Sequence, residues 1–412
     1  MPKPFSLSTF FRMTPDDMLA EFFRRFDTDI PLRDKGGVKE HHVLLMSLMD
    51  DIDESVKNHV EKTMHDIAAL ASKDGMAAFH EAALTCHQPH WLDDLPNKGR
   101  YPTSMHAWLR YPKLFESALA NFRFSGLTYW RRRAHLPIFA PEFTGEKLHQ
   151  LKEALENFFE ERQGRGRVCT VDLYDRGNGM YYITAHPDDY AEDMLVHDDL
   201  ESLNSQTLCK TFEVTLAYDS RRGCCDLYAK VPLAIKRDLE QLFLETIFEE
   251  ELPPYEQAPF DLLPLLKTDF TLTTASEFRI TAFIHVLSLK WPHGAMAHQT
   301  KITESPYRDV RDAFNQAKYP VEGASAEHVK FQFLFHGVDG GRDKSITFEI
   351  RQPFTCTLRN QPQEYLELAH KLLQKWGIEH ENQTTDHEGA VHDICLPLGT
   401  PTSLHDQPES QR

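Results

Sequence analysis

A chain of 412 residues is too long for one ordinary hydrophobic core, and its 41% hydrophobic and 26% charged residues predict two or three globular domains. The net charge of −18 disfavours a protein that coats nucleic acid, because phosphates attract basic surfaces. The sequence has no run of about 18 apolar residues and no signal-peptide pattern, and its seven cysteines form no CxxC pair. We therefore expect a soluble cytoplasmic protein with reduced thiols and no membrane association.

Residues 1–125 have helical periodicity and are predicted to form an all-α domain. Thr14 and Pro15 are typical of a helix start, with Thr14 as the N-cap. Apolar residues at every third or fourth position over 45–70 predict one amphipathic helix of about eight turns, which Gly75 would end. Two further helices are predicted, over 76–86 and 104–122.

Residues 126–167 are predicted to be a basic connector followed by a helix over 146–162, with Gly164 as a helix-ending residue. Between 100 and 167 the chain has 12 Lys or Arg against 7 Asp or Glu, so the remainder carries a charge of about −23. A basic zone in an acidic protein can bind an anionic partner or an acidic region of its own chain.

Residues 168–252 are predicted to form a first α+β unit. Asn178 and Gly179, between two β-rich runs, predict a hairpin. The segment 187–210 is interpreted as a polar crossing to the next strands. Over 212–248, two alternating strands are followed by a proline and an amphipathic helix.

Residues 253–378 are predicted to form a second unit of the same kind. A strand is expected over 278–291 and a helix over 306–318, and the hairpin, proline and helix recur over 329–376. We therefore predict the α+β class, with an N-terminal all-α region followed by two similar units, each an antiparallel sheet with helices. An internal duplication is one hypothesis for this likeness, and chance convergence of hairpin–helix units is the other.

Residues 379–412 are polar, with seven acids against one arginine, and are predicted to be a disordered acidic tail. Attraction between this tail and the basic zone at 100–167 gives a hypothesis of autoinhibition.

The signatures of common enzymes are absent. The sequence contains no GxxxxGK[ST] phosphate loop, no GxSxG nucleophile elbow, no HExxH zinc pair and no GxGxxG turn. Cys86, His87 and His90 carry ligand-like side chains, but zinc needs four such ligands and a helix C-terminus alone favours imidazole. We therefore expect a non-enzyme more than an enzyme, and no cofactor.

A metal site is one hypothesis for the first β-hairpin. Asp172 and His186 are expected to face each other across the two strands, with Asp188 close by, and such oxygen and nitrogen ligands suit Mg²⁺ or Mn²⁺. Asp175 and Asp189 belong to the same acidic group. The alternative is a solvated sheet face followed by a turn, for which the run from His186 to Asp189 is typical.

A second hypothesis for catalysis concerns Glu213, Asp226 and Lys230, which are predicted to lie on adjacent strands. Two carboxylates and a lysine in this arrangement resemble the metal-and-base core of restriction-type nucleases. The paired acid-x-Lys triplet of that family is absent, however, and cross-strand charge pairs on an exposed sheet face are the alternative.

The basic cluster is the main candidate for ligand binding. Arginine pairs with phosphate or carboxylate through two nitrogens, and a neighbouring aromatic ring offers a stacking plane. The alternative is a set of solvated arginines that pair with the acidic remainder of the molecule. The predicted binding residues are Trp130, Arg131, Arg132, Arg133, Arg162, Arg165, Arg167, Arg221 and Arg222.

Taken together, these patterns favour a binding, sensor or adaptor protein that engages an anionic ligand or partner through its basic segment. By analogy only, such proteins serve in multi-protein regulatory or defence-type systems. The expected partners are a protein or a second copy of the chain, with nucleic acid or nucleotide as a further option. The alternative function is a metal-dependent hydrolase or nuclease centred on the first β-hairpin.

Overall fold

The computed structural model describes most of the chain in two compact units, the first built around Met1–Gly126 and the second on Leu127–Gln383. The residues described are 5–28, 46–47, 49, 52–95, 99–138, 141–197, 202–249, 258–267, 269–274, 279–291, 299–304, 309–316, 321, 323–337, 343–361 and 363–380. The predicted acidic tail lies outside them, except for Glu379 and His380, which belong to the second unit.

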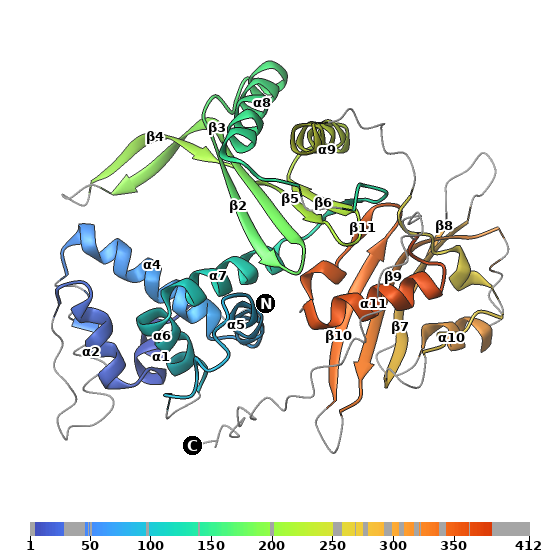
Figure 1. Ribbon diagram of the computed structural model, residues 1–412, viewed down its shortest axis with the longest axis horizontal. Coiled ribbons are helices and arrows are strands. Elements are labelled where there is room, and N and C mark those ends of the chain that lie inside the picture. The colour runs from blue at the N-terminus through green and yellow to red at the C-terminus, as the bar shows by residue number, and fades with distance from the viewer. Residues whose placement is uncertain are drawn as a thin grey trace. The chain divides into compact units, whose positions relative to one another are not determined.

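The fold class is α+β, as the sequence predicts. N-terminal helices are followed by two antiparallel sheets that carry helices of their own (Figure 1). Among the described helices, none combines the length and the apolar character needed to cross a membrane.

The first unit is helical, and aromatic side chains dominate its core. Phe10, Phe22 and Phe23 are fully buried, and the rings of Phe22 and Phe23 meet edge-to-face at 5.3 Å. The described helices of this unit are α1 (Leu7–Met13), α2 (Asp16–Arg24), α4 (Glu54–Leu70), α5 (Lys73–Thr85), α6 (Arg100–Arg110) and α7 (Pro112–Gly126).

The first helix boundary differs from the prediction. Thr14 is not an N-cap: it follows the last residue of α1, and α2 has Pro15 at its N-cap position. The helix α1 was not predicted, because its seven residues span only about two turns and show little periodicity. Its N-cap is Ser6, whose hydroxyl accepts a hydrogen bond from the amide of Thr9.

The predicted single helix over 45–70 is wrong, because Ile52 and Asp53 are not helical and α4 begins only at Glu54. Gly75 does not end a helix either. It lies in the first turn of α5, where its amide donates to the hydroxyl of the N-cap Ser72 at 3.0 Å. A Cβ at Gly75 would lie 2.2 Å from the carbonyl oxygen of Leu70, so glycine permits the close approach of α4 and α5.

The predicted helix over 104–122 is two helices, α6 and α7. The break falls at Tyr111, whose φ of −131° and ψ of 63° are not helical. Pro112 causes it, because proline disfavours the helical conformation in the residue before it.

The first sheet of the second unit has the strand order β1-β6-β5-β3-β2, and β4 pairs with β3. Figure 1 shows α8 (Gly145–Gln163) and α9 (Leu233–Phe248) beside this sheet, and apolar residues of both helices share one core with its strands. The strands are β1 (Arg131–Arg133), β2 (Cys169–Gly177), β3 (Met180–His197), β4 (Leu203–Thr211), β5 (Val214–Asp219) and β6 (Cys224–Ala229).

The hairpin predicted at Asn178 and Gly179 is confirmed. These residues join β2 to β3 with φ values of 52° and 76°, which are typical of a tight hairpin turn. The polar crossing predicted over 187–210 is a hairpin, because β3 continues to His197 and the chain returns as β4. The segment lacks alternation because both faces of this ribbon are largely exposed.

The second sheet has the strand order β11-β10-β9-β7-β8, and the closing helix α11 packs on its apolar face through residues such as Leu372 and Leu373. Its elements are β7 (Ile280–Trp291), β8 (Gln299–Glu304), α10 (Val310–Gln316), β9 (Ser325–Phe335), β10 (Lys344–Arg351), β11 (Thr355–Cys356) and α11 (Gln363–Lys375). Short 3-10 turns lie at Leu263–Leu266 and Leu358–Asn360.

The two sheets share an order of pairing. In the first, the hairpin β3–β4 is followed by the hairpin β5–β6 and the helix α9, and β3 pairs with β5. In the second, β7–β8 is followed by β9–β10 and α11, and β7 pairs with β9. Internal duplication stays a hypothesis that this order is compatible with.

Candidate functional site

The predicted basic cluster lies partly inside the protein. Arg131, Arg132 and Arg133 form the edge strand β1, which pairs antiparallel with β6, and their exposed fractions are only 3%, 2% and 4%. Trp130 is also buried, and its indole nitrogen donates to the carbonyl of Leu127 at 2.9 Å. These four side chains therefore form no surface platform, and binding of an external anion by them is a prediction that the structure leaves untested.

The strand β1 joins the two sheets. The Arg132 amide donates to the carbonyl oxygen of Phe354, just before β11, at 2.9 Å. The guanidinium of Arg131 lies over the ring of Phe354, 4.1 Å from its centroid. Backbone and side chain together thus link the edge of the first sheet to the edge of the second.

At this junction two arginines share one buried carboxylate. Arg132 donates from Nε and Nη2 to the two oxygens of Asp226 at 3.0 and 3.1 Å, a bidentate geometry. Arg359, which follows β11, donates to the same carboxylate from the other sheet. Asp226 belongs to β6, so one carboxylate binds arginines of both sheets.

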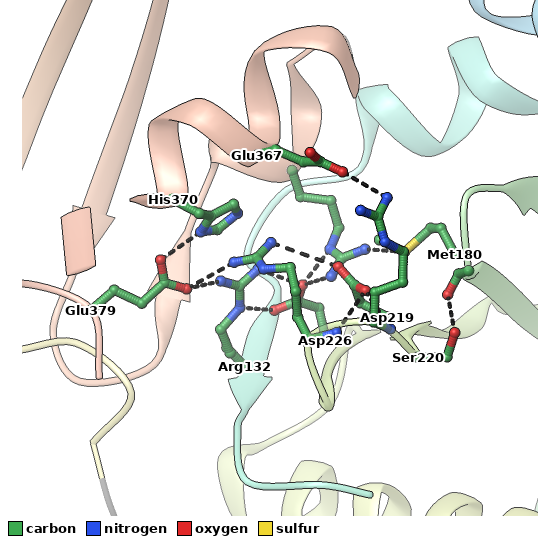
Figure 2. A network of polar contacts seen from close by, with 12 residues as sticks. Arg132, Met180, Asp219, Ser220, Asp226, Glu367, His370 and Glu379 are labelled. Atoms are coloured by element: carbon green, nitrogen blue, oxygen red, sulfur yellow. Dashed lines mark hydrogen bonds and ion pairs between the residues drawn. The ribbon is translucent and has the colours of Figure 1, made fainter. Parts of the chain in front are cut away.

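Glu379 is the second centre of the network. Its Oε1 accepts from Arg132 at 2.8 Å and from Arg222 at 3.1 Å, and its Oε2 lies 2.5 Å from Nδ1 of His370. Figure 2 shows this carboxylate between His370 of α11 and Arg132, with Asp226 beyond. The start of the predicted tail is therefore ordered by buried charges.

A third buried carboxylate, Glu240 of α9, forms ion pairs with the first and third arginines of β1. Its oxygens lie 3.1 Å from Nε of Arg131 and 3.7 Å from Nη1 of Arg133. Arg133 also donates to Gln241 at 3.0 Å. The arginines thus pair with the acidic remainder of the chain, which is the pairing that the alternative interpretation describes, although they are buried and not solvated.

The network keeps its carboxylates ionised. Burial acts to raise the pKa of Asp226, but Arg132 and Arg359 hold it well below its usual range. Burial also acts to raise the pKa of Glu379, but His370 and the charges of Arg222 and Arg132 lower it to about 2. Burial and the charge of Arg222 lower the pKa of His370 to about 3, so this imidazole is neutral at pH 7.

These shifts predict acid sensitivity. The unfolded chain protonates His370 near the ordinary pKa of 6.5 while the folded chain does not, so stability falls as the pH drops from 6.5 towards 3. Glu379 adds a second loss between 4.5, its ordinary pKa, and about 2. We expect His370→Gln to flatten the fall in melting temperature between pH 7 and 5, measured by circular dichroism.

The control is His149→Gln on α8, whose side chain is 63% exposed. This variant should keep the pH dependence of the parent protein. An unchanged slope in His370→Gln would contradict the role assigned to the buried imidazole.

The other predicted arginines lie at the surface or partly buried, and each faces a carboxylate of its own chain. Arg165 is the best held of them: it donates to Asp189 at 2.6 Å and lies 4.0 Å from the centroid of the Phe212 ring. Arg221 lies 2.6 Å from Glu367 of α11. The remaining pairs are Arg162 with Asp238, Arg167 with Glu160, and Arg222 with Asp219 and Glu379.

The residues of the metal hypothesis lie in a different register from the one expected. Asp172 pairs with Thr184 and His186 with Thr170, so Asp172 and His186 are diagonal neighbours and not direct partners. Asp188 pairs with Thr211 of β4. In the part of the chain that the structure describes, no three His, Cys, Asp or Glu side chains gather as metal ligands.

The other ligand-like residues also have partners within the chain. Cys86 lies 3.5 Å from the hydroxyl of Ser117, and His90 lies 3.0 Å from Asp93. Of the nuclease hypothesis, Asp226 is bound by two arginines, and Lys230 follows the end of β6 and lines the groove described next. The hydrolase alternative stays an untested prediction.

A groove of about 530 Å³ opens beside the basic strand. It lies between the segment that enters β1, the end of β6 and the start of α9, and its volume is in the range of small-molecule sites. Its lining includes two lysines and two tyrosines but no acidic residue. The lining residues are Thr128, Tyr129, Tyr228, Ala229, Lys230, Val231, Pro232 and Lys236.

Tyr129 and Lys236 determine the shape and charge of the groove. Tyr129 is 72% exposed and has a φ of 65°, a conformation that a bulky residue rarely adopts. Lys236 holds this residue by donating from Nζ to its carbonyl oxygen at 3.1 Å. Burial, with the charge of Arg131 behind it, lowers the pKa of Lys236.

No protein-family model matches this sequence, and no curated protein is significantly similar to it.

Several residues of the junction and the groove were not predicted from the sequence. Glu240 gave a signal, because it interrupts the apolar stripe of α9 between Leu239 and Phe243. Glu379 was assigned to the tail because of its polar surroundings, and Arg359 had no local signal at all. Tyr129 and Lys236 come together only through the pairing of β1 with β6.

Proposed function

We propose that this protein is a non-enzymatic binding protein, and that its ligand is a phosphate-bearing molecule with a planar ring, the chemistry of a nucleotide. The groove lined by Tyr129, Lys230 and Lys236 is the binding site. The observation that carries the proposal is a lining with two lysines and no acid, in a chain that has 63 Asp or Glu against 45 Lys or Arg.

The charge of the groove suits a phosphate. Lys230 is exposed at the mouth, where its ammonium can act as a mobile point charge. Lys236 is half-buried and already oriented by its hydrogen bond to the Tyr129 carbonyl. The groove also adjoins the start of α9, so the positive end of the helix dipole adds to the attraction of an anion.

The aromatic side chains suit a planar ring. The side chain of Tyr129 has a free face for stacking, because most of it is exposed. A non-glycine residue at positive φ costs free energy, and such residues are concentrated at ligand-binding positions. The buried arginines support this function indirectly, because they fix the strand that follows Tyr129.

We expect Lys230→Glu to weaken the binding of ADP at least about tenfold, because an attractive charge becomes repulsive next to the phosphates. Isothermal titration calorimetry of the full chain with ADP and with inorganic phosphate provides the measurement. Lys371→Glu on the exposed side of α11 has the same charge change and should bind like the parent protein.

A parent protein that binds neither ADP nor phosphate at millimolar concentration would refute the proposal. Equal affinities of the parent and Lys230→Glu would refute the location of the site.

Tyr129→Asn separates binding from stability. Asparagine tolerates positive φ, so the variant should be as stable as the parent or up to about 1 kcal/mol more stable. Loss of the ring should weaken binding of ADP about fivefold or more while leaving binding of inorganic phosphate unchanged. Equal losses for ADP and phosphate would show that the ring does not stack on the ligand.

The wider role is a proposal by analogy. A ligand-dependent protein of this kind fits a regulatory or defence-type assembly, in which occupancy of the groove is reported to a partner. Inside the second unit, the groove adjoins the β1 strand that links the two sheets, so a bound ligand has a direct structural route to both.

A further inference from the structure

The end of the β3–β4 hairpin is an isolated two-stranded ribbon. Up to Ala185, β3 pairs with β2 on one side and with β5 on the other. Over 188–197 it pairs with β4 alone, and β4 pairs with no other described strand. Figure 1 shows this ribbon extending away from the rest of the first sheet.

Both faces of the ribbon are open to solvent. Apart from the half-buried Leu208, every residue of β4 is exposed. Tyr190, Leu195 and Leu203 are large apolar side chains that remain 54%, 69% and 57% exposed. A two-stranded hairpin without a covering layer is only marginally stable in water, so the ribbon requires a partner.

The two edges of the ribbon differ in charge. The β3 edge carries Asp188, Asp189, Glu192 and Asp193, and charged side chains protect an edge from pairing. The β4 edge, Leu203–Thr211, has one charged residue, Lys210, and neither an acid nor a proline. An exposed edge of nine residues whose single charge lies near one end is able to accept another strand.

We propose that this edge pairs with a second copy of the chain, β4 against β4 in antiparallel orientation around a twofold axis. The result is a four-stranded ribbon in the order β3-β4-β4-β3. The sequence of β4 is self-complementary. Around an axis at Thr207, its one charged residue, Lys210, lies opposite Asn204 of the second copy, so no like charges meet. In a chain of net charge −18, an edge without an acidic residue is where two copies can approach.

The test is the oligomeric state of the full chain, by analytical ultracentrifugation over micromolar concentrations. The parent protein is expected to have twice the monomer mass of 47.7 kDa at tens of micromolar. The double variant Ser205→Asp/Cys209→Asp adds two negative charges to β4. Around an axis at Thr207, each new charge lies opposite the other one on the second copy. We expect its dimer dissociation constant to be raised about tenfold or more, because the charges repel across the axis.

The variant leaves the ribbon itself intact, because Ser205 and Cys209 lie opposite the uncharged Leu195 and Ala191 of β3. A matched control, Gln150→Glu/Asn157→Asp, adds the same charge on the exposed side of α8 and should dimerise like the parent. A parent protein that is monomeric throughout, or a dimer that survives in the β4 variant, would overturn the proposal. Both outcomes are independent of ligand binding in the groove.

Discussion

Replacing Asp226 with asparagine is expected to destabilise the second unit by about 3–5 kcal/mol, because two buried guanidinium groups lose their shared negative charge. The side chains of Arg132 and Arg359 are each only 3% exposed, so water cannot replace the carboxylate. Asparagine keeps the shape of the side chain, so the loss reports the charge itself. Urea unfolding followed by tryptophan fluorescence gives the free energy.

The matched control is Asp238→Asn. Asp238 pairs with Arg162 at the surface, where the two side chains are 41% and 50% exposed. Solvent-exposed ion pairs contribute little, so this variant should lie within about 0.5 kcal/mol of the parent. Similar free energies for the two variants would contradict the view that the junction is held by buried charge.

Gly75→Ala is expected to destabilise the first unit by about 2–4 kcal/mol, because a Cβ at this position meets backbone and not a movable side chain. The nearest atom would be the Leu70 carbonyl oxygen at 2.2 Å, followed by the Leu70 Cα at 2.5 Å. The helices α4 and α5 must separate to admit the methyl group. Thermal unfolding by calorimetry resolves the effect on this unit.

Gly126→Ala at the end of α7 is the control, since a Cβ there has no atom within 4 Å. Alanine has the higher helix propensity, so this variant should be unchanged or more stable by at most about 1 kcal/mol. A tolerated Gly75→Ala would show that α4 and α5 are not in close contact.

Most of the fold could be predicted because its signals are local. The Asn178-Gly179 turn, the glycine after α8 and the proline before α9 each act on neighbouring residues, and the structure has a turn or a helix end at each. The predicted helices and strands were wrong where the same local sequence pattern is compatible with two structures. Apolar periodicity continues across Tyr111, but Pro112 divides the helix, and the exposed ribbon has no apolar face to reveal its strands.

The site could be predicted less well, because burial of a charged residue depends on distant partners. Three consecutive arginines suggest a basic surface, yet β1 pairs with β6 and receives Asp226, Glu240 and Glu379 from three other parts of the chain. Asp226 and Glu379, which accept hydrogen bonds from Arg132, are 94 and 247 residues away from it in the sequence. The net charge of −18 does indicate an excess of carboxylates that can pair with arginines, but it does not show where in the fold they lie.

The most direct test of the proposed binding function is a map of hydrogen exchange in the full chain with and without 5 mM ADP. The groove predicts slower exchange confined to the segments at 128–131 and 228–237, which include its lining. Protection of the segment 162–167, which carries Arg162, Arg165 and Arg167, or no protection anywhere, would contradict it.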